Sequence, residues 1–116
     1  MNSLQDCLDL FLAGLVGEVA PSTQEWYRLR LGQFVEFARD ELQQSHPCEV
    51  SAGSLRAFKA HLLNRGVTPN SVHGYQRATR RWFGWMVDER FLDRNVARDV
   101  PLIKLPPQPV SYTHLT

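Results

Sequence analysis

The sequence predicts an all-α fold in which four helices form one compact bundle. Apolar residues recur at helical spacing in four segments, and no stretch shows the sustained alternation of apolar and polar residues that is typical of a strand. The connections between the four segments are short, about two to six residues, as in bundles of neighbouring helices. A length of 116 residues with 43% hydrophobic and 22% charged residues fits a single globular domain.

The first helix is expected over residues 4–17. Ser3 stands at the N-cap position, and Asp6 follows at the spacing of a capping box. The helix has a wide apolar stripe and no basic residue; the stripe consists of Leu8, Phe11, Leu12 and Leu15. This segment contains acidic residues and is too short to span a bilayer, so we interpret it as a helix of a soluble protein.

The second and third helices also carry their own start signals. The second is expected over residues 22–44, with Ser22 as N-cap and Glu25 at the capping-box position. Its apolar stripe consists of Tyr27, Leu31, Phe34, Ala38 and Leu42. The third is expected to begin at Ser51 and to stop at Gly66, a typical C-terminal capping residue.

The fourth helix, over residues 68–88, has two chemically opposite faces. Thr68 is its expected N-cap and Pro69 occupies the first helical position. At about 100° per residue, the face expected to pack inward consists of Val72, Tyr75, Thr79, Trp82, Phe83 and Met86. The opposite face consists of Asn70, Gly74, Arg77 and Arg81, with His73 and Arg80 toward its rim.

The outer face of this fourth helix carries three arginines and no acidic residue, whereas an ordinary solvated helix mixes charges of both signs. Net charge is uneven along the chain. Residues 1–55 hold three basic and eight acidic side chains, a net of −5, and residues 56–116 hold ten basic and four acidic side chains, a net of +6. A solubilising face is the simpler interpretation, but the charge asymmetry and the polar residues beside the arginines favour a surface for nucleic acid.

Residues typical of catalysis or metal binding are not gathered into any recognisable motif. Cys7 and Cys48 are far apart and stand in no metal-binding spacing, so we expect no cofactor and no metal, and a reducing, cytoplasmic setting. After the fourth helix we expect one short helical turn from Asn95 and then an extended, proline-rich linker. The predicted division is a helical domain over residues 1–100 and a linker or tail over residues 101–116.

The order of these elements resembles a known family. Residues 22–37, which begin S-T-Q-E-W-Y-R, residues 55–96, which contain G-V-T-P-N-S-V-H-G-Y, and the K-L-P at residues 104–106 are similar to the N-terminal core-binding domain of tyrosine recombinases, the phage integrase and Xer-like family. The resemblance covers residues 3–109. It implies a four-helix, SAM-like domain that grips a recombination-site duplex while a separate C-terminal domain performs strand exchange.

The resemblance also implies functional residues and partners. The implied DNA contacts are Thr68, Asn70, Ser71, His73, Arg77, Arg80 and Arg81, with Lys59 and Lys104 as weaker candidates. The catalytic residues of the family would lie beyond residue 116, and Tyr112 is not their tyrosine nucleophile, so this chain is expected to be inert by itself. Asn95-Val96 departs from the Asn-Pro that is common in the family. The implied partners are duplex DNA and other recombinase protomers, the latter through residues 4–17, and no membrane.

A second hypothesis makes the chain an α-helical protein-interaction domain. The first helix motivates it, because a wide apolar stripe on a helix without basic residues could dock a neighbouring protein.

Overall fold

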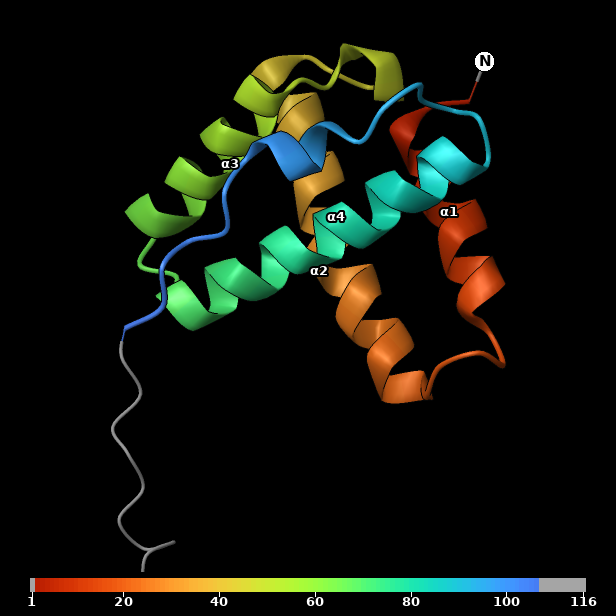
Figure 1. Ribbon diagram of the computed structural model, residues 1–116, viewed down its shortest axis with the longest axis horizontal. Coiled ribbons are helices and arrows are strands. Elements are labelled where there is room, and N and C mark those ends of the chain that lie inside the picture. The colour runs from red at the N-terminus through yellow and green to blue at the C-terminus, as the bar shows by residue number, and fades with distance from the viewer. Residues whose placement is uncertain (1, 107–116) are drawn as a thin grey trace, which may run out of the picture.

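The computed structural model describes residues 2–106 of the chain. These residues contain four α-helices and two short 3-10 helices, joined by loops. The elements are α1 (Leu4–Leu15), α2 (Pro21–Leu42), η1 (Pro47–Glu49), α3 (Ala52–Asn64), α4 (Pro69–Asp88) and η2 (Val96–Asp99). Helix α2 is the longest and contacts the other three helices, with α4 crossing it and α1 beside it (Figure 1). No strand occurs within these residues, which confirms the predicted all-α class.

Three of the four helix starts are capped as the sequence predicts. The Ser3 hydroxyl accepts the Asp6 amide at 3.1 Å, and the Asp6 carboxylate accepts the Ser3 amide in return. Ser51 caps α3 in the same reciprocal way with Ser54. The Thr68 hydroxyl accepts the Ser71 amide at 3.3 Å at the start of α4. These local hydrogen bonds explain why three boundaries are readable from sequence.

The predicted N-cap of the second helix is wrong by two residues. Ser22 is not its cap, because α2 begins at Pro21 and Ala20 occupies the N-cap position without a side-chain hydrogen bond. Proline suits the first helical position, since its fixed φ is helical and no amide is lost there. Glu25 does not close a capping box and instead pairs with Arg28.

The core is built around the inward face of α4. Trp82 has no exposed surface, and its ring centroid lies 6.5 Å from that of Phe34 and 5.5 Å from that of Phe83. The predicted inward residues of α4 are all buried except Tyr75. Tyr75 is half-buried, and its hydroxyl donates to Gln33 Oε1 at 2.7 Å. The predicted inward face is therefore confirmed.

The apolar stripe of α1 is covered by the chain's own helices. Leu8, Phe11 and Leu15 are buried, and the Phe11 ring packs edge-on against Tyr27 and Trp85. The stripe is thus used inside the domain. Leu12, the fourth residue of the stripe, is half-buried, so most of the stripe that motivated the protein-interaction hypothesis is covered within the domain.

The chain after α4 turns back across that helix. Asn95 caps η2, since its side-chain oxygen accepts the Ala97 amide at 3.0 Å, which confirms the predicted helical turn. From η2 the chain returns along α4 toward the start of that helix (Figure 1). Residues 101–106 have no regular secondary structure, and the rest of the predicted linker, with Tyr112 and His114, lies outside the described residues.

The two cysteines should differ sharply in reactivity. Cys7 is fully buried, and this burial, assisted by the nearby Asp6 charge, raises the pKa of its thiol from an ordinary 9.0 to about 11. Cys48 is exposed. With iodoacetamide at pH 8 we expect the native domain to be alkylated at Cys48, and at Cys7 at least about 100-fold more slowly. Mass spectrometry with and without urea would test this; equal rates in the native state would contradict the packing of α1.

None of the helices within residues 2–106 combines the length and the apolar character that crossing a bilayer requires.

Candidate nucleic-acid interface

A groove runs between the first turns of α2 and the outer face of α4. Its α2 wall consists of Ser22, Thr23, Trp26 and Tyr27, and the other wall consists of Arg77, Arg80, Arg81, Arg98 and Leu102. Four of the nine lining residues are arginines and none is acidic. The arginines come from α4 and η2, and Leu102 comes from the segment that follows η2.

No carboxylate within residues 2–106 forms an ion pair with the arginines of this groove. Within residues 2–106, the arginines that form ion pairs are Arg28 with Glu25, Arg39 with Asp40, and Arg94 with Asp99. None of the four groove arginines is among them. The groove therefore presents a positive potential that is available to an anion.

The groove arginines differ in how firmly they are held. The guanidinium carbon of Arg81 lies 5.4 Å from the centroid of the Tyr27 ring, and Nη1 lies 3.4 Å from the Tyr27 hydroxyl. Arg80 is half-buried and donates from Nη2 to the Val100 carbonyl at 2.9 Å, while its buried Nε finds no hydrogen-bond partner within residues 2–106. Arg77 is exposed and forms no side-chain hydrogen bond to any other described residue.

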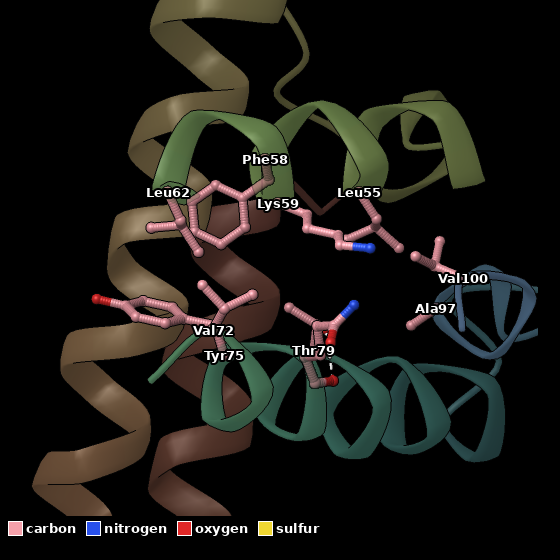
Figure 2. A pocket seen from close by; sticks show the side chains of 10 residues that line it. Leu55, Phe58, Lys59, Leu62, Val72, Tyr75, Thr79, Ala97 and Val100 are labelled. Atoms are coloured by element: carbon pink, nitrogen blue, oxygen red, sulfur yellow. Dashed lines mark hydrogen bonds between the residues drawn. The ribbon is translucent and has the colours of Figure 1, made fainter. Parts of the chain in front are cut away.

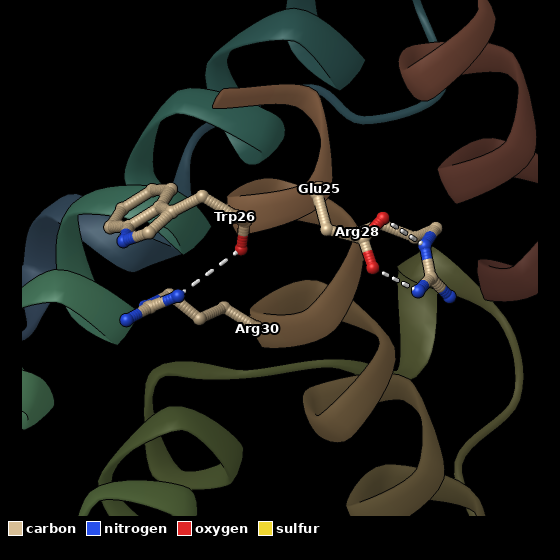
Figure 3. A network of polar contacts seen from close by, with 4 residues as sticks. All are labelled: Glu25, Trp26, Arg28 and Arg30. Carbon is tan, nitrogen blue, oxygen red and sulfur yellow. Dashed lines mark hydrogen bonds and ion pairs between the residues drawn. The ribbon is translucent and has the colours of Figure 1, made fainter. Parts of the chain in front are cut away.

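A fifth arginine lies behind the α2 wall. The Arg30 guanidinium stacks over the Trp26 ring at 4.4 Å from its centroid and lies 5.5 Å from that of Tyr75. Figure 3 shows this stack on one side of α2 and the Glu25–Arg28 pair on the other. The hydrogen bond from Arg28 lowers the pKa of the Glu25 carboxyl. Arg28 is thus paired with a carboxylate, whereas the Arg30 guanidinium lies against Trp26, a residue of the groove wall.

Gly74 lies where side chains of α2 pack against the backbone of α4. A Cβ atom at this position would lie 3.3 Å from Trp26 Cζ2 and 3.6 Å from Arg30 Nε. Gly74 was expected on an open outer face, but it is half-buried against α2. The outer face of α4 is therefore one wall of a groove, and of the expected set only Asn70, Arg77 and Arg81 are exposed, whereas Gly74, His73 and Arg80 are half-buried.

The predicted DNA contacts fall into separate places. Arg77, Arg80 and Arg81 lie together in the groove. The polar set at the start of α4 is outside the groove lining and consists of Thr68, Asn70, Ser71 and His73. The hydroxyls of Thr68 and Ser71 are also engaged with each other in the helix cap, at 3.2 Å. Lys104 is exposed, two residues beyond Leu102.

Lys59 is separated from the arginines. It lines a cavity between α3, α4 and η2 whose other walls are largely apolar, and its side chain extends across the space between α3 and α4 (Figure 2). The cavity volume of about 20 Å³ has room for a single water molecule. Val100 lines this cavity and Leu102 lines the basic groove, so the C-terminal segment passes between Lys59 and the groove.

The sequence interpretation missed the α2 wall of the groove. Ser22, Trp26 and Arg30 follow one another at a spacing of four residues, which places them on one helix face. That spacing could have predicted a shared face on α2. It indicates a groove wall only once α2 is known to pack against the basic face of α4. Arg98 also lines the groove and was not among the predicted DNA contacts.

The side chains at this surface suit anion binding. Within residues 2–106, no group of three or more histidine, cysteine, aspartate or glutamate side chains could hold a metal ion. The groove contains arginines, hydroxyls and aromatic rings, which are groups that bind anions and stack on planar ligands.

Comparison with known proteins gives one likeness. No family model and no curated protein matches the chain. Its structure is similar to the crystal structure of the N-terminal domain of a phage integrase/site-specific recombinase from Haloarcula marismortui, with a TM-score of 0.78 and 20% sequence identity over 86% of this chain and 95% of that one. The chain therefore has the all-helical fold of that recombinase N-terminal domain.

Proposed function

We propose that this domain is the DNA-binding module of a site-specific recombinase of the tyrosine recombinase family, and that it grips duplex DNA through the basic groove. The observation that carries the proposal is the set of four arginines around one groove without a carboxylate partner. The likeness to a recombinase N-terminal domain supports the same function.

The chemistry of the groove suits the phosphate backbone. Guanidinium groups bind phosphates through charge-assisted, often bidentate hydrogen bonds, and these contacts supply most of the affinity for DNA. The hydroxyls of Ser22 and Thr23 add neutral donors on the opposite wall. Asn70 and His73, farther toward the start of α4, would then extend the interface and could reach base edges.

The proposed module acts by positioning DNA and not by breaking it. Strand exchange would belong to a separate domain of the recombinase, and the partners would be the duplex and other protomers assembled on it. The setting would be the cytoplasm, where such a duplex is available.

A titration of duplex DNA at several salt concentrations tests the proposal. A labelled duplex of about 30 base pairs, followed by fluorescence anisotropy, should show log K falling with log salt at a slope near −3.6, or about −0.9 for each of four phosphates. Polyglutamate of matched charge, as a competitor, controls for unspecific anion binding and should displace the duplex poorly. An affinity that does not depend on salt concentration, or no binding at 50 mM salt, would refute the proposal that the groove binds DNA phosphates.

A further inference from the structure

We infer that Gln76 is a positioning residue, which clamps the C-terminal segment onto α4 and thereby places Lys104 beside the basic groove. The inference rests on the proposed function for its DNA-binding consequence. The clamp itself rests on geometry alone.

The side-chain amide of Gln76 both donates a hydrogen bond to and accepts one from a single short stretch of backbone. Its Nε2 donates to the Pro101 carbonyl at 3.1 Å, and its Oε1 accepts the Ile103 amide at 2.7 Å. An amide side chain can both donate and accept, and a carboxylate or an ammonium group offers only one of the two. Gln76 thus serves the segment much as a neighbouring strand would.

Arg80 extends this clamp by one helical turn. Residues 76 and 80 are four apart and share a face of α4. Arg80 donates to the Val100 carbonyl at 2.9 Å, and its own carbonyl accepts Asn95 Nδ2 at 3.0 Å. Two side-chain hydrogen bonds to the backbone, from Asn95 and from Arg80, therefore hold the chain between residue 95 and Val100 against α4. Beyond Val100, Gln76 supplies the side-chain hydrogen bonds that hold residues 101–103.

The clamp sets which way the following residue faces. Ile103 packs against the core, whereas Leu102 lines the basic groove. Leu102 and Ile103 already alternate between the groove and the core, and the same alternation continued by one residue puts Lys104 on the side of Leu102. Because Lys104 directly follows the clamped Ile103 amide, its charge is held at the edge of the groove. An unclamped segment would have to lose conformational freedom on binding DNA.

The substitution Gln76→Met tests this role, because methionine keeps the length and helix preference of glutamine and removes both hydrogen bonds. Hydrogen exchange should show the Ile103 amide losing its protection while the Phe83 amide keeps it. Duplex affinity should fall about three- to tenfold, since the competent arrangement is populated less often. Gln5→Met on α1 is the matched control and should change neither quantity.

A double-mutant cycle with Lys104→Ala separates positioning from a merely structural effect. If Gln76 acts through Lys104, the double variant should bind no more weakly than Lys104→Ala alone. Losses that multiply would overturn the inference, as would an Ile103 amide that is unprotected in the wild type. Failure of the wild type to bind duplex would refute the proposed function and the role of Lys104, whereas the exchange comparison would still decide whether Gln76 clamps the segment.

Discussion

The substitution Trp82→Ala is expected to lower the free energy of unfolding by about 3–5 kcal/mol. Trp82 is completely buried between Phe34 and Phe83, so truncation would leave a large cavity where α4 meets α2. A domain of this size has a total stability of only about 5–15 kcal/mol, so a large share of it would be lost. Urea denaturation followed by circular dichroism measures the change.

Trp82→Phe provides a control at the same position. The indole Nε1 of Trp82 is buried and has no hydrogen-bond partner within residues 2–106, so phenylalanine removes an unsatisfied group while keeping an aromatic ring. We expect this change to cost under about 2 kcal/mol, since only part of the volume is lost. A cost below about 1 kcal/mol for Trp82→Ala would mean that the inward face of α4 is misassigned.

The double substitution of Arg77 and Arg81 with alanine is expected to weaken duplex binding about 60-fold at 0.1 M salt, and to reduce the salt slope by about 1.8. Each lost phosphate contact removes about 0.9 log units of affinity at that salt concentration. Both side chains are exposed, so each change should alter stability by under about 0.5 kcal/mol. Anisotropy titrations and thermal melts of the same preparations measure both quantities.

A second pair of arginines provides the matched control. Arg28 and Arg39 lie on α2, outside the groove, and each is paired with a carboxylate. Replacing both with alanine changes the net charge of the domain by the same amount as the groove variant. Neither side chain lines the groove, and exposed charges are partly screened at 0.1 M salt, so affinity should change much less than in the groove variant. Equal weakening by the two pairs would show that net charge, and not the groove, attracts DNA.

Much of the fold is determined locally and is therefore readable from sequence. The caps Ser3, Ser51 and Thr68 act within three residues of their own position. The inward face of α4 follows from helical periodicity, and its residues are buried as expected. Where two local signals competed, at Pro21 and Ser22, the proline prevailed, because its fixed φ needs no partner.

Only part of the candidate site could be predicted from the sequence, because the groove depends on which helix faces pack against each other. The arginines of α4 could be recognised from their shared face and from the absence of acids. Trp26 and Tyr27 are about 50 residues earlier in the chain, and the packing of α2 against α4 brings them opposite those arginines. The sequence of α1 likewise did not indicate what its apolar stripe packs against. In the structure the stripe packs against α2 and α4.

The four helices, the side-chain caps of three of them and the basic face of the last follow from hydrogen bonds and spacing within single segments, so they are readable from the amino-acid sequence. The tertiary structure alone decided that this face became a groove, that Lys59 was excluded from it, and that Gln76 fastened the returning chain beside it. The physical reason is that packing joins residues far apart in the chain. The geometry of their contacts depends on the whole core and not on any one helix.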